Sequence, residues 1–179
     1  MRRIDAGTLL RSLELQYIGP GHFEAAAALC RGNPLYYEHY GAPPPGPAEI
    51  LQDLEALPPG KGYEDKYYLG GFDGGQLRLL LDLIDGHPDE GTAWIGFFML
   101  DARLQGLGLG SRLVSELLGA LGAYGFRRAA LGVVAGNPQA EAFWRKNGFE
   151  FYGEPRSGRQ PVIRTMQRML GADTNMMEE

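Results

Sequence analysis

The sequence predicts an α/β fold: one domain with a mixed seven-stranded sheet and helices on both faces. Three observations lead to this prediction. Residues 66–100 hold three strand-like segments separated by turn signals, residues 109–121 switch to helical spacing, and residues 128–169 alternate again between strand and helix patterns. A length of 179 residues suits a single core. We expect the domain to cover residues 1–170 and the polar residues 171–179 to form a disordered tail.

Local patterns predict the elements of the first half. Residues 13–18 alternate and predict a strand, residues 22–31 are alanine-rich and helical, and residues 33–47 combine an aromatic stretch with a proline-rich loop. Pro47 suits the first turn of a helix over residues 48–57. Three strands follow at residues 66–72, 76–84 and 92–100, as an antiparallel meander joined first by the turn signal Asp73-Gly74-Gly75.

The second half changes period. Leu109, Leu113, Leu117 and Leu121 recur every four residues and predict an amphipathic helix that packs on a sheet. A buried strand (128–134), a helix (138–147) and two closing strands (149–152 and 162–169) complete the order βααβββαβαββ.

Composition excludes several classes of protein. The formal net charge of −5 argues against nucleic-acid binding, which needs a basic surface. The single cysteine, Cys30, cannot form an internal disulfide, and no apolar run is long enough to span a membrane. His22, His39 and His87 are scattered and predict no metal site. Since the N-terminus does not look like a signal peptide, we expect a cytoplasmic protein without membrane partners. We expect it to be a monomer or a homodimer.

A glycine-rich turn follows the strand at residues 92–100. It consists of Gln105, Gly106, Leu107, Gly108, Leu109, Gly110 and Ser111 and leads into the next helix. Glycines let backbone N–H groups approach a ligand, and a helix N-terminus adds free donors and partial positive charge. The turn therefore predicts a phosphate site, flanked by Arg103 and Arg112. A tight turn that packs the helix closely on the sheet is the alternative, with about even weight for such a turn taken alone.

Two common nucleotide motifs do not fit this turn. A Walker loop needs Gly-Lys-Ser/Thr, whereas Gly110 is followed by Ser111 and Arg112. A Rossmann or methyltransferase site needs an acid at the end of the next strand, and no acid lies between Glu116 and Glu141. A methyltransferase is therefore a distant alternative.

Two motifs in register resemble the GNAT superfamily of acyl-CoA-dependent N-acetyltransferases. Gln105-x-x-Gly108-x-Gly110 is similar to the family's pyrophosphate motif, Arg/Gln-x-x-Gly-x-Gly/Ala. The second motif, Asn-x-x-Ala-x-x-Leu/Phe-Tyr-x-x-x-Gly-Phe, is similar to Asn137-x-x-Ala140-x-x-Phe143-Trp144-x-x-Asn147-Gly148-Phe149. The resemblance covers roughly residues 13–170. It implies a GNAT-like fold, acetyl-CoA as co-substrate, no metal, and acetyl transfer to a primary amine of a small molecule or peptide.

The resemblance also implies roles for single residues. In this family acetyl-CoA lies in a V-shaped opening between two parallel strands, here residues 92–100 and 128–134. Met99 and Leu100 would offer backbone groups to the pantetheine arm, Asn137 would meet that arm, and Phe143 would pack beside it. The backbone of the glycine-rich turn, from Gln105 to Ser111, would hold the pyrophosphate. A helix cap is a second role for Asn137, compatible with the first.

One residue departs from the family pattern. Where the family often has a tyrosine that protonates the departing thiolate, this chain has Trp144. Indole cannot act as an acid in this pH range. Either the thiolate leaves unaided, since a thiol pKa of ~8.5 makes it a fair leaving group, or Tyr124 or Tyr152 takes the role. The departure motivates an alternative function, a non-catalytic acyl-CoA-binding sensor or partner module.

The base and the amine site follow from the residues themselves. Asp82 lies inside the apolar strand at residues 76–84 and shares a face with Leu80 and Ile84, which favours partial burial and a raised pKa. A structural, hydrogen-bonded role is equally weighted for Asp82, and Glu90 is the second candidate base. The aromatic residues Tyr36 and Tyr37, with His39, suit a small amine or a peptide end, or else they cover the sheet edge.

Overall fold

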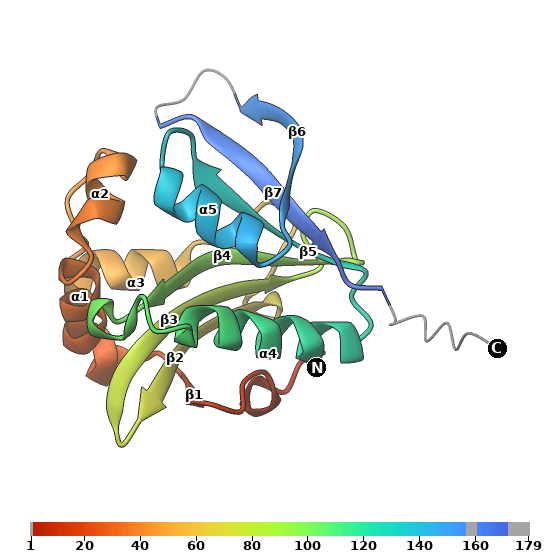
Figure 1. Ribbon diagram of the computed structural model, residues 1–179. Helices are drawn as coiled ribbons and strands as arrows, with labels where there is room; N and C mark the ends of the chain where they lie inside the picture. Colours follow the sequence, from red (N-terminus) through yellow and green to blue (C-terminus); the bar gives the residue numbers. More distant parts are fainter. Residues whose placement is uncertain (1, 157–160, 172–179) are drawn as a thin grey trace.

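The computed structural model describes residues 2–156 and 161–171. These residues form one seven-stranded mixed sheet in the order β1-β2-β3-β4-β5-β7-β6, with helices on both faces (Figure 1). Residues 172–179, which include nearly all of the predicted tail, lie outside the described residues. Among the described residues, no helix combines the length and the apolar character that a membrane crossing requires.

The observed elements follow the predicted order closely. The strands are β1 (Glu14–Tyr17), β2 (Lys66–Asp73), β3 (Gln76–Asp85), β4 (Thr92–Leu100), β5 (Arg128–Val134), β6 (Glu150–Arg156) and β7 (Ile163–Met169). The helices are α1 (Phe23–Arg31), α2 (Pro34–Tyr40), α3 (Pro47–Glu55), α4 (Leu109–Ala123) and α5 (Pro138–Lys146). The hairpin between β2 and β3 turns at Gly74 and Gly75, both at positive φ, as the turn signal predicts.

The helix α2 is the element that the sequence prediction missed, so the predicted order lacks one helix. Pro34 occupies its first turn and Gly41, in the left-handed conformation at φ 79°, ends it. Tyrosine has only average helix propensity, so the aromatic run does not predict a helix by itself. Packing supplies the missing stabilisation, because Tyr37 is buried and Tyr36 lies edge-on to Phe97 of β4.

Two apolar clusters cover the two faces of the sheet. The larger cluster lies under α4 and α5 and includes Leu113, Leu117 and Trp144. The smaller cluster lies under α1, α2 and α3 and includes Tyr68 and Leu80. In Figure 1, α4 and α5 lie in front of the sheet and α3 lies behind it. The two faces therefore offer two separate surfaces for binding.

The parallel strands β4 and β5 separate part-way along their length. Their pairing runs from Thr92 opposite Arg128 to Ile95 opposite Leu131 and stops there. Beyond that point β5 continues beside β7, whereas β4 continues beside β3 only. Residues 96–100 of β4 therefore have one edge without a strand partner. This divergence is the V-shaped opening expected between these two strands.

A β-bulge in β4 lies where the strands separate. Asp82 is opposite Phe97 and Leu83 is opposite Ile95, so Gly96 is an extra residue in β4. A Cβ on Gly96 would lie 2.9 Å from Oδ2 of Asp82, so any larger residue there would require the Asp82 side chain to shift. The bulge therefore brings the backbone of β4 directly against a carboxylate of β3.

Candidate active site

The free edge of β4 presents alternate backbone groups to the opening. The N–H of Asp101 donates to the carbonyl of Arg78 at 2.7 Å, which identifies these residues as a hydrogen-bonded pair of the β3–β4 ladder. Such pairs alternate along an antiparallel ladder, so the backbone of Met99 bonds to β3, while Phe98 and Leu100 point their backbone groups into the V. This alternation favours Phe98 over Met99 for the predicted backbone contact, which stays a prediction, and the side chain of Met99 is buried in the smaller cluster.

The carbonyl of Leu100 already has two donors. It accepts hydrogen bonds from Nδ2 of Asn33 at 3.3 Å and from Nε2 of Gln105 at 2.9 Å. A carbonyl oxygen has two lone pairs, so this one is fully used. What Leu100 can offer a ligand in the opening is its N–H.

The glycine-rich turn lies at the open end of the V, between the short 3-10 helix η4 (Ala102–Leu104) and α4. Gly106 and Gly108 have φ of 76° and 83°, and a Cβ on either would meet no atom within 4 Å. The space over these two residues is therefore open to a ligand beside the free N–H groups of α4. Gly110 differs, because a Cβ there would lie 3.2 Å from the ring of Phe143. The two alternatives for the turn thus apply to different glycines: open space at Gly106 and Gly108, close packing at Gly110.

Asn137 and the aromatic residues of α5 form the other side of the opening. The side-chain oxygen of Asn137 accepts a hydrogen bond from the N–H of Ala140 at 3.1 Å and caps α5, one of its two predicted roles. The ring of Trp144 lies 5.0 Å from that of Phe143 and 5.7 Å from that of Phe98, measured between centroids. Trp144 is buried and fills the core between β4 and α5.

The two tyrosines considered as replacement acids lie away from the opening. The hydroxyl of Tyr124 bonds to the backbone N–H of Asp5 and to Thr8, beyond the C-terminal end of α4. Tyr152 lies on β6 under the guanidinium of Arg128, where β4 and β5 are still paired. Neither residue is placed to protonate a group bound in the V.

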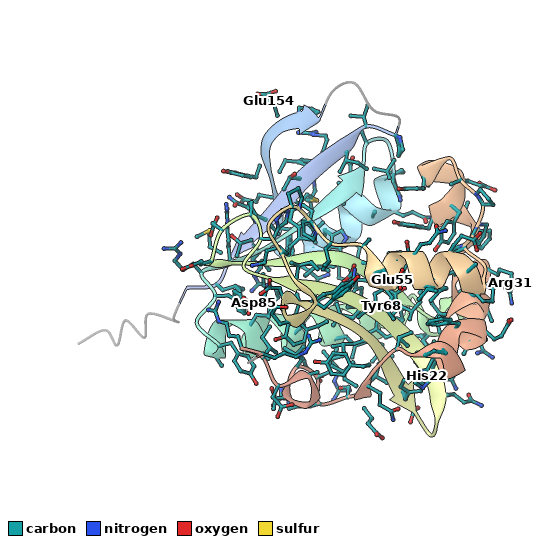
Figure 2. The ribbon with its side chains drawn as sticks, turned by 180° about the vertical axis from the view of Figure 1, so that it is seen from behind. His22, Arg31, Glu55, Tyr68, Asp85 and Glu154 are labelled. Atoms are coloured by element: carbon teal, nitrogen blue, oxygen red, sulfur yellow. The ribbon has the colours of Figure 1, made fainter. Side chains whose placement is uncertain are left out.

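A cleft of about 470 Å³ lies on the face of the sheet covered by α2 and α3. It shares its floor with the opening, because Gly96 and Phe97 of β4 line it. The other lining residues are Tyr36, Tyr37, Tyr40, Ala42, Pro43, Pro44, Pro45, Gly46, Glu49, Gln52, Asp53, Ala56, Tyr68 and Asp82. Figure 2 views this face and shows Tyr68 against the sheet near the end of α3 that carries Glu55. The cleft therefore combines aromatic walls with several carboxylates.

Asp82 lies in this cleft with one oxygen bonded and the other without a partner. Its Oδ2 pairs with Nζ of Lys66 at 3.1 Å, with the Asp82 and Lys66 side chains 16% and 4% exposed, respectively. Its Oδ1 is a buried atom for which the described residues provide no hydrogen-bond partner. Burial raises the pKa of Asp82 above the ordinary aspartate value, and the positive charge of Lys66 opposes part of that rise. A carboxylate with a spare oxygen and a raised pKa is suited to accept a proton.

The surroundings of Asp82 set the polarity of the cleft. Burial also raises the pKa of Asp53, again with Lys66 as the opposing charge. Burial raises the pKa of Tyr36 to about 12 and that of Tyr68 still further, so both phenols are neutral at physiological pH. The lining residues include no Lys or Arg, which leaves the described part of the cleft acidic and aromatic.

Two predicted residues are not brought into this cleft. His39 is on α2 but is not among the described residues that line the cleft. Glu90 is exposed in the β3–β4 turn, next to the end of β4 that remains paired with β5. The structure therefore groups Asp82 with Tyr36 and Tyr37, and separates Glu90 from all three.

A larger hollow of about 810 Å³ lies on the opposite face, between residues 11–13 and α4. Its most buried carboxylate, Glu116, accepts hydrogen bonds from the hydroxyl and N–H of Ser12 and the N–H of Arg11. These donors lower the pKa of Glu116 despite its burial, which makes it a poor proton acceptor. The smaller cleft, beside the free edge of β4, is the better candidate for chemistry.

Sequence reasoning missed Lys66, Asp53 and Gly96. A faint signal existed for Lys66, because a lysine beginning the apolar run 66–72 needs a partner if it faces inward. Asp53 and Gly96 carry no comparable signal. Their roles depend on where α3 lies and on the bulge in β4, neither of which local sequence reveals.

The sequence model of the acetyltransferase (GNAT) family matches residues 36–149, a span that holds the V, the glycine-rich turn and Asp82. The chain belongs to the GNAT acetyltransferase family. Its resemblance to that family in the two sequence motifs is thereby confirmed.

Two curated relatives match part of the chain. Spermine/spermidine N(1)-acetyltransferase of Bacillus subtilis is 32% identical over 89 residues, which are 49% of this chain and 59% of that protein. Probable spermine N(1)-acetyltransferase of Bacillus subtilis subsp. natto is 30% identical over 89 residues, again 49% of this chain and 59% of that protein. The chain therefore matches somewhat over half the length of these curated relatives.

Solved structures show the same GNAT fold. An acetyltransferase from Thermus thermophilus has a TM-score of 0.72 at 24% identity, covering 90% of this chain and 99% of that one. A phosphinothricin acetyltransferase from Sinorhizobium meliloti, solved in complex with acetyl-CoA, has a TM-score of 0.62 at 21% identity, covering 90% of both chains. The predicted fold class is confirmed, including the mixed seven-stranded sheet.

Proposed function

We propose that this GNAT protein transfers the acetyl group of acetyl-CoA to a primary amine of a small, positively charged molecule. The observation that carries the proposal is the junction at Gly96. There the free edge of β4, which ends in an open glycine-rich turn, meets a cleft that holds a half-bonded carboxylate. Two substrates can therefore meet at Gly96, one bound in the opening and the other in the cleft.

The residues of the opening fit acetyl-CoA, which supplies the acetyl group as a thioester when bound. The N–H groups of Phe98 and Leu100 hold an extended arm along the free edge of β4, as an added strand would be held. The backbone of Gly106 and Gly108 and the first turn of α4 hold the pyrophosphate. Phe143 and Asn137 border the opening on the α5 side.

Asp82 takes the proton from the attacking amine. Its spare oxygen accepts the proton directly or through one water, and its pKa, raised by burial, brings its proton affinity closer to neutral pH. Asp82 lies against the bulge at Gly96, so proton transfer occurs beside the free edge of β4. The proposed mechanism is direct attack, without a covalent intermediate on the protein.

The cleft supports a positively charged acceptor. Glu49, Asp53 and Asp82 supply negative charge, and the rings of Tyr36 and Tyr68 supply faces that attract cations. An acidic cleft favours an amine with a second positive charge over a neutral one. The curated relatives point to the same class, since their names specify spermine and spermidine. We therefore name a polyamine as the first acceptor to test.

A non-catalytic acyl-CoA-binding module is the second candidate. The observation that favours it is Trp144, which places a buried indole where the family often has an acidic hydroxyl. A ligand-binding chain without turnover would bind acetyl-CoA and leave every amine unmodified. Direct transfer does not require an acid at this position, because a thiolate is a fair leaving group by itself.

The deciding experiment measures binding and turnover separately. Isothermal titration with acetyl-CoA should show binding at micromolar concentration, and release of free thiol should depend on added spermidine. A monoamine such as benzylamine, which has no second positive charge, serves as the comparison at the same pH. Binding of acetyl-CoA without thiol release for spermidine, a panel of other amines or peptide N-termini would favour the non-catalytic module. A lack of binding at high micromolar acetyl-CoA would remove both candidates.

A further inference from the structure

Asn33 and Gln105 form a polar clasp between segments that lie far apart in the sequence. Nε2 of Gln105 donates to Oδ1 of Asn33 at 2.7 Å and to the carbonyl of Leu100 at 2.9 Å. Nδ2 of Asn33 donates to the same carbonyl at 3.3 Å and to the carbonyl of Leu29 at 3.1 Å. The clasp thus joins the end of α1, the end of β4 and the glycine-rich turn.

The clasp assigns the side chain of Gln105 to a protein contact. Its two N–H bonds both go to protein oxygens, and its position is the first residue of the motif that was expected to hold the pyrophosphate. The backbone of the turn remains open at Gly106 and Gly108. The side chain of this motif residue therefore links the turn to another segment, and the open backbone of Gly106 and Gly108 is what the turn offers to a phosphate.

The segment reached by the clasp is the start of α2. Asn33 immediately precedes Pro34, the first residue of α2, and its side chain makes no capping bond to that helix. A helix of seven residues has little stability of its own, so its position depends on its attachments. For α2 these include the contact of Tyr36 with Phe97, the buried Tyr37 and the clasp at Asn33.

We propose that Asn33 and Gln105 are positioning residues that couple the acetyl-CoA site to the amine cleft. A ligand held by the turn and by the edge of β4 restrains Gln105 and Leu100, and through Asn33 it restrains α2 with its tyrosines. The amine then meets a cleft whose aromatic wall is already ordered, which lowers the ordering cost of its binding. This inference rests on the proposed function, and linkage makes the coupling reciprocal.

Hydrogen exchange of the α2 amides tests the coupling without knowledge of the acceptor. In the unsubstituted protein, saturating acetyl-CoA should slow exchange of the α2 amides by at least about fivefold. A change of this size corresponds to the net free energy of about one side-chain hydrogen bond, such as those of the clasp. In Asn33→Ala and in Gln105→Met, this ligand-induced slowing should fall below about twofold, while the glycine-rich turn keeps its own protection. Gln16→Ala is the matched control, because Gln16 is an exposed amide on β1 whose side chain bonds to nearby Glu14.

The acetyl-CoA affinity of Gln105→Met separates the clasp from a phosphate contact. The coupling proposal expects a dissociation constant within about threefold of the unsubstituted value, measured by isothermal titration. A tenfold loss in Gln105→Met that is absent in Asn33→Ala would assign Gln105 to the phosphate and overturn the proposal. It would also be overturned if α2 failed to respond to acetyl-CoA in the unsubstituted protein, or if the slowing in both variants stayed as large as in the unsubstituted protein. A lack of acetyl-CoA protection anywhere in the chain would instead remove the proposed function.

Discussion

At the scale of single residues, the pKa of Asp82 reflects a balance between burial and one charged partner. Lys66 keeps it charged and oriented through Oδ2, while Oδ1 is left without a partner among the described residues. Burial opposes the charged form and raises the pKa of Asp82. If Lys66 were the dominant influence, the pKa would be lowered and the carboxylate would be a weak base. This balance is what supports the proposal that Asp82 accepts the proton of the amine.

The substitution Asp82→Asn should lower turnover by about 100-fold while acetyl-CoA affinity is kept, because the amide keeps the size but not the basicity. Thiol-release kinetics from pH 6 to 9, with titration calorimetry and thermal melting, measure these effects. In the unsubstituted protein, kcat/KM should rise with pH through the raised pKa of Asp82. In the variant, the loss should shrink at high pH, where more of the amine is already neutral.

Glu90→Gln is the matched control for Asp82→Asn, because Glu90 is exposed and outside the cleft. It should keep normal turnover. A stable Asp82→Asn protein with normal turnover would rule out Asp82 as the base. A fall in melting temperature that accounts for the lost activity would assign Asp82 a structural role.

The glycine-rich turn yields a prediction at the same scale. Gly108→Val places a branched side chain in the open space over the turn, at a positive φ that valine rarely adopts. Acetyl-CoA affinity should fall by at least ~10-fold, about 1.4 kcal/mol, measured by titration calorimetry. Gly119→Val is the control, because Gly119 lies mid-helix on the exposed face of α4 and its Cβ would also meet nothing within 4 Å. Unchanged affinity in a folded Gly108→Val protein would show that the glycine serves the turn alone.

At the scale of elements, Lys66 ties α3 to the sheet. Besides Asp82, its Nζ donates to the carbonyls of Asp53 at 2.8 Å and Ala56 at 2.7 Å, at the C-terminal end of α3. A cation at this end also interacts favourably with the helix dipole. Lys66 therefore links the wall of the cleft to its floor.

Lys66→Met should lower the free energy of unfolding by about 3 kcal/mol at pH 8, because it leaves Asp82 as a buried charge without its partner. The pKa of Asp82, already raised, should rise further. The destabilisation comes from burying the ionised Asp82 carboxylate without its partner. The loss of stability should therefore diminish as pH falls through the pKa of Asp82 and the carboxylate becomes protonated. Urea unfolding at pH 8 and pH 5 measures both effects. Lys61→Met, which removes a more exposed pair with Asp65 at 3.5 Å, should cost less than about 1 kcal/mol, and an equal cost for the two variants would contradict the prediction.

At the scale of the whole molecule, the V joins the two halves of the sheet. The β1–β4 half and the β5–β7–β6 half are paired only through residues 92–95 of β4, within the described residues, so a ligand in the opening contacts both halves. Ligand binding should therefore stabilise the fold as a unit.

Acetyl-CoA at 100 times its dissociation constant should stabilise the protein by about 2.7 kcal/mol and raise Tm by about 5–10 °C. Differential scanning calorimetry over a range of acetyl-CoA concentrations measures the shift. S-adenosylmethionine at the same concentration should leave Tm unchanged. A shift with S-adenosylmethionine and none with acetyl-CoA would revive the methyltransferase alternative and contradict the family-based assignment of the cofactor.

The sequence by itself determined the fold class, nearly all elements and the place of the glycine-rich turn. These features depend on local periodicity, on turn residues such as Gly74-Gly75, and on two motifs whose spacing spans a fixed helix and strand. It also predicted that Asp82 shares a face with Leu80 and Ile84, because side chains alternate strictly along a strand. It did not determine which residues lie opposite Asp82 on neighbouring strands.

Tertiary structure decided those partners through two irregularities. The turn at Gly74-Gly75 begins a register in which Asp82 would lie opposite Tyr67, on the α4 face, but a shift between Gly71 and Phe72 places it opposite Tyr68, on the same face as Lys66. The bulge at Gly96 then brings β4 against the carboxylate. Each shift is one residue, and it is stabilised by contacts between strands and helices distant in the sequence. Local patterns therefore located the glycine-rich turn, while strand register and helix packing determined which side chains surround the cleft.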